Sequence, residues 1–227
     1  LAAVRSFNVV VVCCLLRLAT PNTSFWLLLL GFLWHRLAPE FGGYFVAGCD
    51  EVWMGVESGS QKILNAMSKG LSLASVHSAR ARLKSAGIRA CFFLQFGYPG
   101  EGWPEIAETI QLIRQTRPDD IGVSLSYPLP GTEFYLRVQA QLGAKRNWDD
   151  SDDLCTMHTA AYTDTFYHAL RDALHAEVNA PESPDTFRLW TRVHALEPIS
   201  RNTNVLTLNH EPSFLPLASL AAATRRA

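Results

Sequence analysis

The sequence lacks clustered cysteines and the short motifs of several common enzyme classes. Its five cysteines, Cys13, Cys14, Cys49, Cys91 and Cys155, are odd in number and form no CxxC pair. Neither a disulfide framework nor a self-contained zinc or iron–sulfur site is therefore indicated. No glycine-rich phosphate loop, Gly-x-Ser-x-Gly turn or HExxH helix occurs. We expect a reducing compartment and hence a cytoplasmic protein.

An excess of charge is also missing, because 20 Lys and Arg face 21 Asp and Glu, a formal net charge of -1. No surplus of cations is left to neutralise phosphates, which argues against a nucleic-acid partner. Hydrophobic residues make up 48% of the chain and aromatic residues 11%, the reverse of the composition of disordered proteins. The 227 residues suffice to bury a hydrophobic core.

Charged residues are scarce in the N-terminal segment, residues 1–46, whose structure the sequence leaves uncertain. Two apolar runs occur there, at 9–16 and 25–34, separated by Arg17 and Pro21. Each run is shorter than the roughly 18 to 20 apolar residues that a membrane-spanning helix needs, so we predict no membrane span. Because the chain opens on Leu1 instead of Met, we expect a fragment or an arbitrary start.

From residue 47 to 143 the pattern is a repeating β–α unit of about 35 residues. Apolar, β-prone runs predict strands over 51–56, 88–96 and 121–126. Helices are predicted over 61–67, 73–86, 104–115 and 132–142, with Ser60, Ser72 and Thr132 as N-caps. The pattern predicts an α/β fold with about three parallel strands and helical crossovers. Beyond it we predict a helical extension over 144–200, with helices near 164–178 and 184–196, and a loose tail over 201–227.

Polar residues follow each predicted strand, at the edge of a parallel sheet where ligands gather. Glu57 could bond a ligand hydroxyl or amine there, or it could be a solvated or capping carboxylate. Lys69, twelve residues on, could bind a ligand carboxylate at this edge or only stabilise the end of its helix. The turns at 97–101 and 127–131 could bring bare backbone against a flat ring or a phosphate, or could simply end their strands.

Other candidate sites are weaker. His168 and His175 lie two helical turns apart, too far to chelate one metal without further ligands. The acidic run at 149–153 is interpreted as a solvated turn in preference to a cation site.

Three stretches of the chain resemble, in order and spacing, the second half of a radical S-adenosylmethionine (SAM) domain. They are GVESGSQKILNAMSKG at 55–70, FFLQFGYPGE at 92–101 and RPDDIGVSLSYPLPGTEFY at 117–135, followed by NWDDSDDL at 147–154. More narrowly, they resemble the cobalamin-binding branch that includes anaerobic magnesium-protoporphyrin monomethyl ester cyclase. The resemblance covers roughly 47–178. It implies an incomplete (β/α) TIM-like barrel, S-adenosylmethionine and a 4Fe–4S cluster as cofactors, and leaves cobalamin open for the full-length protein.

The resemblance also assigns positions to the SAM site, at or near the carboxyl ends of the three predicted strands. These positions are Glu57, Ser58, Lys69, Phe96, Gly97, Pro99, Ser124 and Leu125. Glu57 matches a polar residue that contacts SAM, and Lys69 matches the basic residue that reaches the SAM carboxylate. Phe96, Gly97 and Pro99 match the turn near the adenine, and Ser124 and Leu125 match the neighbouring strand. No catalytic residue and no metal ligand is assigned.

The CxxxCxxC motif that binds the cluster in this family is absent from the chain. Residues 1–46 are also too few for the missing strands, so we expect that the chain alone does not hold the cluster or cleave SAM. One hypothesis is therefore a fragment of a radical SAM enzyme, which needs its missing half or a partner chain to act on a substrate such as a tetrapyrrole or a lipid. The alternative is a non-catalytic half-barrel that serves as a binding or interaction module. A CxxxCxxC reading frame upstream of Leu1 would favour the first.

Overall fold

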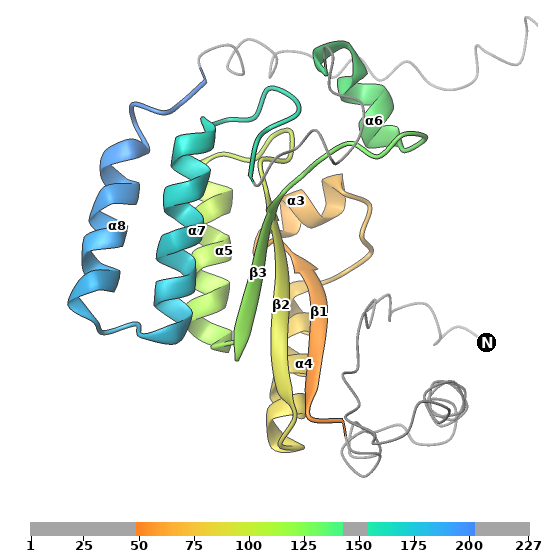
Figure 1. Cartoon of the computed structure of the whole chain (residues 1–227). Helices are drawn as coiled ribbons and strands as arrows, with labels where there is room; N and C mark the ends of the chain where they lie inside the picture. The colour runs from red at the N-terminus through yellow and green to blue at the C-terminus, as the bar shows by residue number, and fades with distance from the viewer. Residues whose placement is uncertain (1–48, 143–153, 203–227) are drawn as a thin grey trace, which may run out of the picture.

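A small parallel sheet with helical crossovers forms the centre of the molecule (Figure 1). The computed structural model describes residues 49–142 and 154–202, so the predictions for 1–46, for 149–153 and for most of the tail lie outside the described residues. The sheet has the order β1-β2-β3 and both pairings are parallel. Its strands are β1 (Glu51–Glu57), β2 (Arg89–Phe96) and β3 (Asp120–Leu125). The predicted α/β class with three parallel strands is confirmed.

Helices connect and follow the strands at nearly the predicted positions. They are α3 (Gln61–Ala66), α4 (Leu73–Ser85), α5 (Trp103–Thr116), α6 (Glu133–Val138), α7 (Asp164–Asn179) and α8 (Pro184–Leu196). The helix predicted over 132–142 is shorter than expected, because α6 gives way to a 3₁₀ turn at Gln139–Gln141. No helix within the described ranges is long and apolar enough to cross a membrane.

Two of the three predicted helix caps are confirmed. The hydroxyls of Ser72 and Thr132 accept hydrogen bonds from the backbone at the starts of α4 and α6, as N-caps do. For Ser60 the predicted N-cap position, at the start of α3, is confirmed, but a capping hydrogen bond is not. Its hydroxyl is buried and has no hydrogen-bond partner among the residues described, and its backbone N–H donates to Ser58 Oγ at 3.1 Å.

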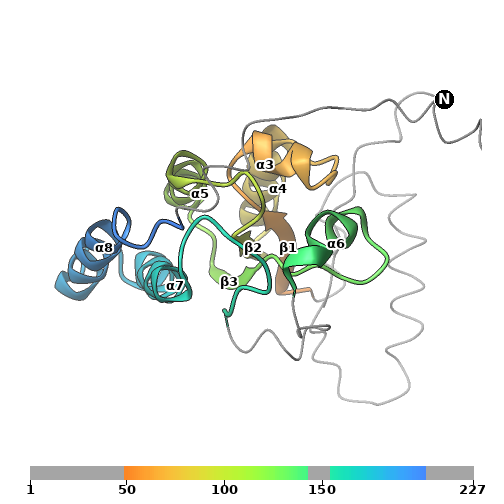
Figure 2. The same cartoon turned by 90° about the horizontal axis from the view of Figure 1, so that it is seen from above.

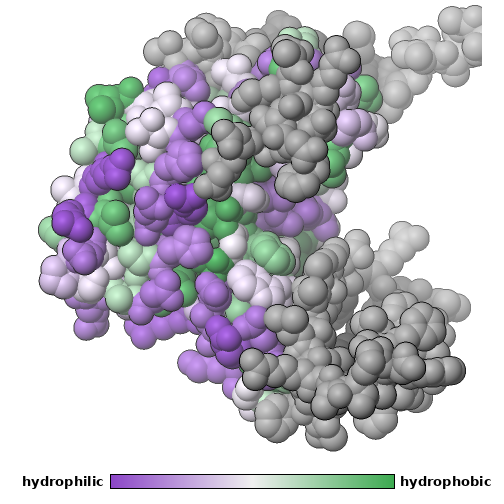
Figure 3. Space-filling view, viewed as in Figure 1, coloured by the Kyte–Doolittle hydropathy of each residue, from purple (hydrophilic) through white to green (hydrophobic). Residues whose placement is uncertain are grey.

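One face of the sheet carries most of the core. Figure 2 shows α3, α4, α5, α7 and α8 gathered on one side of the strands, with α6 near their carboxyl ends. Alternate strand residues such as Met54, Phe92 and Ile121 are buried in one cluster with residues of α4, α5, α7 and α8, as the two-residue period of a strand requires. Hydrophilic and apolar side chains are interspersed over α7 and α8 in the space-filling view (Figure 3).

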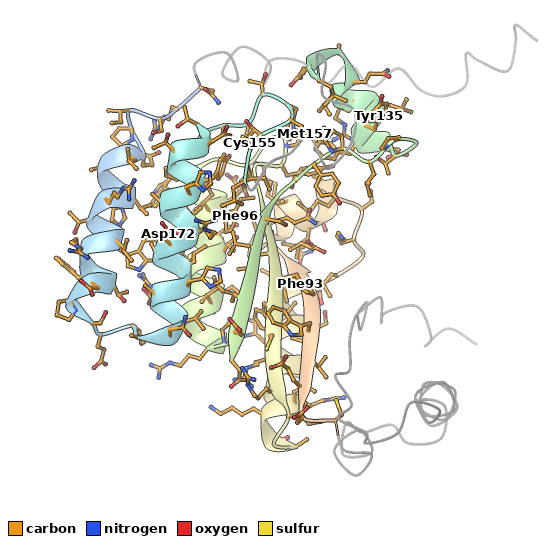
Figure 4. All side chains as sticks on the ribbon, in the orientation of Figure 1. Phe93, Phe96, Tyr135, Cys155, Met157 and Asp172 are labelled. Atoms are coloured by element: carbon orange, nitrogen blue, oxygen red, sulfur yellow. The ribbon has the colours of Figure 1, made fainter. Side chains whose placement is uncertain are left out.

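The opposite face of the sheet is less covered. Trp53 of β1 and Phe93 of β2 stack there, with ring centroids 4.7 Å apart, and Phe93 is 41% exposed. In Figure 4 Phe93 lies lower than Phe96, and Met157 and Cys155 lie above both, toward the carboxyl ends of the strands. Gly122 lies beneath the Phe93 ring, where a Cβ would stand 2.9 Å from Phe93 Cδ1. Three parallel strands, with one face that no described helix covers, are compatible with part of a barrel, but the described sheet is open and small.

Candidate functional site

Glu57, at the end of β1, has the most unusual backbone of the predicted site residues. Its φ is 65°, in the left-handed region that non-glycine residues rarely adopt, and the register with β2 shifts between Gly55 and Glu57. A Cβ on Gly55 would lie 3.2 Å from Glu57 Oε1, so the carboxylate is folded over the Gly55 backbone. Backbone strain of this kind concentrates at functional sites.

Lys69 meets Glu57 directly. Lys69 Nζ donates to Glu57 Oε1 at 2.9 Å, and the Glu57 side chain is 9% exposed whereas that of Lys69 is 40% exposed. Glu57 Oε2 is buried and has no hydrogen-bond partner among the described residues. The structure thus brings together two residues that the sequence placed at one edge, and it leaves one acceptor atom unused. A flexible ammonium beside a carboxylate acceptor is complementary to the amine and carboxylate of an amino acid.

Ser58 is engaged inside the fold. It is fully buried, its Oγ lies 3.3 Å from Thr109 Oγ1, and it accepts the Ser60 N–H. The Gly59 N–H donates to the same Thr109 hydroxyl at 2.9 Å. These bonds hold the turn after β1 against α5, so the contacts of Ser58 lie within the protein.

The turn after β2 is organised around Gly97. Its φ is 77°, its N–H donates to Glu101 Oε2 at 2.5 Å, and its carbonyl accepts from His158 Nε2 at 3.0 Å. Phe96 is buried in the core, whereas Pro99 is half-buried. Because a carbonyl can only accept, His158 carries its hydrogen on Nε2, and its Nδ1 is a buried acceptor without a partner in the described chain.

Burial changes the charge of both groups that hold Gly97. Burial raises the pKa of Glu101 to about 8, aided by the charge of Glu105 and opposed by the Gly97 hydrogen bond. Burial also lowers the pKa of His158, and its hydrogen bond to Gly97 opposes this effect only in part. At neutral pH both side chains are therefore mainly uncharged.

Sequence reasoning treated Glu101 only as part of a turn, and it missed His158. A carboxylate directly after the Pro-Gly turn of a buried strand is a signal that could have drawn attention to Glu101. Nothing near His158 in the sequence indicates its contact with a residue 61 positions away.

The end of β3 lies beside the same turn. The Ser126 N–H donates to the Phe96 carbonyl at 2.7 Å, and a Cβ on Gly97 would lie 3.6 Å from Leu125 Cδ2. Leu125 is buried, whereas Ser124 is exposed and its hydroxyl donates to the Leu94 carbonyl at 3.3 Å. Leu125 therefore adjoins the Gly97 turn, while Ser124 extends from the opposite side of its strand.

Hydrogen bonds also join this turn to α3. The Tyr98 hydroxyl donates to the Ala66 carbonyl at 2.9 Å, three residues before Lys69, and Lys62 Nζ donates to the Gly100 carbonyl at 3.1 Å. We call this edge the rim and define it by Glu57, Lys69 and the turn at 97–101. A groove of about 500 Å³ contains none of these rim residues; it is lined by residues of α4 and α5 such as His77 and Gln111, and by Gly59 of the turn after β1.

The described residues do not fit an iron–sulfur cluster. They contain no group of three His, Cys, Asp or Glu side chains placed to hold a metal ion. Cys49 and Cys91 are buried, and burial raises the pKa of Cys91 to about 12, which opposes the thiolate form that binds metals.

Comparisons with known proteins give partial matches. No family model matches the chain. Over 102 residues it is 30% identical to a protein of Pyrococcus horikoshii named as an uncharacterized methyltransferase, covering 44% of this chain and 22% of that protein. Over 83 residues it is 34% identical to a protein of Methanocaldococcus jannaschii named, provisionally, as a methylthiotransferase, covering 37% and 18%. The matched part of the chain thus spans about a fifth of each relative. These similarities support a radical SAM-like relationship and nothing narrower.

Proposed function

We propose that the rim is the SAM-contacting part of an incomplete (β/α) barrel in a radical SAM-like enzyme of the methyl- or methylthio-transferring kind. The names of the two relatives support the reaction class, and the parallel sheet supports the barrel. The remaining strands and the cluster ligands would come from a missing half or a partner chain, because the CxxxCxxC motif is absent here. Binding and orienting SAM are the roles left to this chain.

The Glu57–Lys69 pair is the observation that carries the proposal. Glu57 Oε2 is buried without a partner in the part of the chain that the structure describes, and a ligand ammonium would supply the missing donor. Lys69 is 40% exposed on its side chain, so its ammonium can turn from Glu57 to the ligand carboxylate. The turn at Gly97 would then face the adenine, as the resemblance implies. The residues of this chain would hold and orient SAM, and the reductive chemistry would come from a cluster held outside it.

Calorimetric titration of the full chain with S-adenosylhomocysteine, a stable SAM analogue, tests the proposal. Glu57→Gln removes the negative charge that faces the ligand amine, and Lys69→Met removes the cation. We expect each variant to bind at least about tenfold more weakly, since a hydrogen bond to a charged group contributes about 1.5 to 3 kcal/mol.

Glu51→Gln is the matched control, because Glu51 begins the same strand at its opposite end and pairs with Arg89 and Trp53. This variant should bind like the wild type. Absence of binding by the wild-type chain, or equal losses in Glu51→Gln and Glu57→Gln, would contradict the proposal.

A second candidate, a non-catalytic interaction module, is favoured by the sheet face over which no helix within residues 49–142 and 154–202 packs. The stacked rings of Trp53 and Phe93 offer an apolar surface to a partner chain, and Lys69 already balances the charge of Glu57 without any ligand. A chain that fails to bind S-adenosylhomocysteine but retains its fold would support this candidate over the first.

A further inference from the structure

Two side chains hold Gly97, one close to it in the sequence and one far from it. Glu101, four residues on, accepts its N–H, and His158, 61 residues on, donates to its carbonyl. We call Glu101, Gly97 and His158 the Gly97 clamp. Both backbone polar groups of one residue are thus fixed by buried side chains, an arrangement that the resemblance did not assign.

The clamp determines the path of the backbone at the rim. Gly97 has a φ of 77°, and a Cβ there would lie within 3.5 to 3.6 Å of Ala160, Tyr167 and Leu125. The turn is therefore packed closely on its inner side. If Glu101 released the Gly97 N–H, that group would be left buried without an acceptor, which costs about 1 to 3 kcal/mol and favours a rearranged turn.

The clamp accommodates an uncharged Glu101. Glu101 is 3% exposed, and its Oε1 has no hydrogen-bond partner within the described residues. Among these residues, the hydrogen-bond donor to Glu101 is the Gly97 N–H, and no cation bonds to its carboxyl group. A carboxylate in this position would be a buried charge with one donor, an unfavourable state. The titratable groups on the elements packed around it are Lys62 of α3, Glu105 of α5, His158, and Tyr167 of α7.

These neighbours do not provide a compensating charge. Lys62 is exposed and pairs with Glu105 at 2.7 Å, so its charge is already engaged. Glu105 adds negative charge, and burial raises the pKa of Tyr167, which keeps its hydroxyl neutral. His158 is kept neutral by burial, which lowers its pKa. Ionisation of Glu101, whose pKa is about 8, therefore places a negative charge in the clamp that no neighbouring cation balances.

We propose that Glu101 and His158 are positioning residues that give the turn at 97–101 its ligand-competent shape, and that ligand binding at the rim requires the protonated Glu101. This inference rests on the proposed function. It adds a pH control to the site: the ionised Glu101 would be a buried charge with the Gly97 N–H as its donor, and moving that carboxylate toward solvent displaces the turn. No group is transferred; one proton leaves the Glu101 carboxyl to solvent.

Titration of the full chain with S-adenosylhomocysteine at pH 7 and pH 9 tests the clamp. If only the protonated form binds, the apparent affinity of the wild type falls about tenfold between these values, in proportion to the competent fraction. Glu101→Gln mimics the neutral carboxyl, since its amide oxygen can accept the Gly97 N–H. It should bind like the wild type at pH 7 and lose less affinity at pH 9. Titration of the ligand amine affects both chains equally.

Glu108→Gln is the control, because Glu108 is an exposed acid on α5; it should follow the wild-type profile. If the affinities of the wild type and Glu101→Gln changed equally with pH, the proposed requirement for protonated Glu101 would be wrong, while the proposal of SAM binding would stand. Absence of binding by every chain at both pH values would instead overturn the proposed function and, with it, the ligand-linked role of the clamp.

Urea unfolding gives a readout that does not depend on ligand. The pKa of Glu101 is raised from 4.5 to about 8 in the folded chain, so the folded state holds its proton more tightly than the unfolded state. Stability from this group is complete below pH 4.5 and declines as the pH rises to about 8. The wild-type midpoint should therefore fall relative to that of Glu101→Gln between pH 5 and pH 8. A constant difference between the two midpoints would contradict the buried, proton-dependent clamp.

Discussion

At the scale of single residues, two buried carboxyl groups share the rim and have different surroundings. Glu57 has Lys69 at 2.9 Å, so its negative charge is balanced, and its second oxygen has no hydrogen-bond partner among the described residues. Glu101 has the Gly97 N–H as its hydrogen-bond partner, and burial raises its pKa to about 8. The first group is suited to a cationic ligand group, and the second to holding backbone.

Gly59 shows how closely the rim is joined to the helical layer. A Cβ at this position would lie 2.4 Å from Thr109 Cα and 2.5 Å from the Glu108 carbonyl oxygen. Gly59→Ala must therefore push the turn after β1 away from α5, and we expect a loss of about 1 to 3 kcal/mol in the free energy of unfolding. Urea denaturation followed by circular dichroism measures this loss.

Gly102→Ala is the control for that prediction, because its Cβ would meet Glu105 Oε2 at an ordinary 3.5 Å. It should cost less than Gly59→Ala. Equal stabilities of the wild type and Gly59→Ala would show that the turn and α5 can separate without loss, contrary to the packing described above.

At the scale of elements, one carboxylate joins three helices. Glu177 of α7 accepts two hydrogen bonds from Arg114 of α5, at 2.9 and 3.1 Å, and one from Trp190 Nε1 of α8 at 2.5 Å. The Arg114 guanidinium also lies 5.2 Å from the centre of the Trp190 ring. Burial opposes the ionisation of Glu177, but the bonds from Arg114 and Trp190 outweigh it and lower its pKa. Glu177 is thus an ionised centre that holds α8 against the rest of the helical layer.

Glu177→Ala should destabilise the chain by about 1.5 to 3 kcal/mol, because it leaves the half-buried Arg114 and the buried Trp190 N–H without their acceptor. Urea denaturation followed by tryptophan fluorescence measures the change. Arg188→Ala is the control, since Arg188 pairs only with Asp185 among the described contacts and both side chains are 78% exposed; it should change stability by less than about 1 kcal/mol. Similar losses in both variants would show that the Glu177 contacts do not stabilise α8.

Elements are also the scale at which the sequence was most informative. Apolar runs and the stripe Ile106, Ile110 and Ile113 located the strands and α5 to within about two residues, because these patterns reflect which face of each element is buried. The contact between His158 and Gly97 could not be predicted from the sequence, because it joins residues 61 positions apart and no local pattern indicates it. The sequence placed Glu57 and Lys69 at one edge, but only the fold shows that they bond to each other. The roles of the predicted SAM-site residues stay predictions.

At the scale of the whole molecule, the described sheet has open edges and one face that no described helix covers. β1 and β3 each pair with β2 alone among the described strands, so each presents an edge of backbone donors and acceptors. The face bearing Trp53 and Phe93 has no helix from the described part of the chain packed over it. Open edges and exposed apolar faces are the features by which sheets associate.

We therefore expect the isolated full chain to self-associate. Sedimentation velocity should show a weight-average sedimentation coefficient that rises with protein concentration. Phe93→Gln removes the more exposed ring of the stacked pair and should reduce that rise. Phe187→Gln is the matched control: Phe187 is 77% exposed but belongs to α8, away from the sheet, so this variant should behave like the wild type. A wild-type chain that sediments as a monomer at every concentration would mean that the sheet is already covered, and the need for a missing half or partner chain would lose its structural basis.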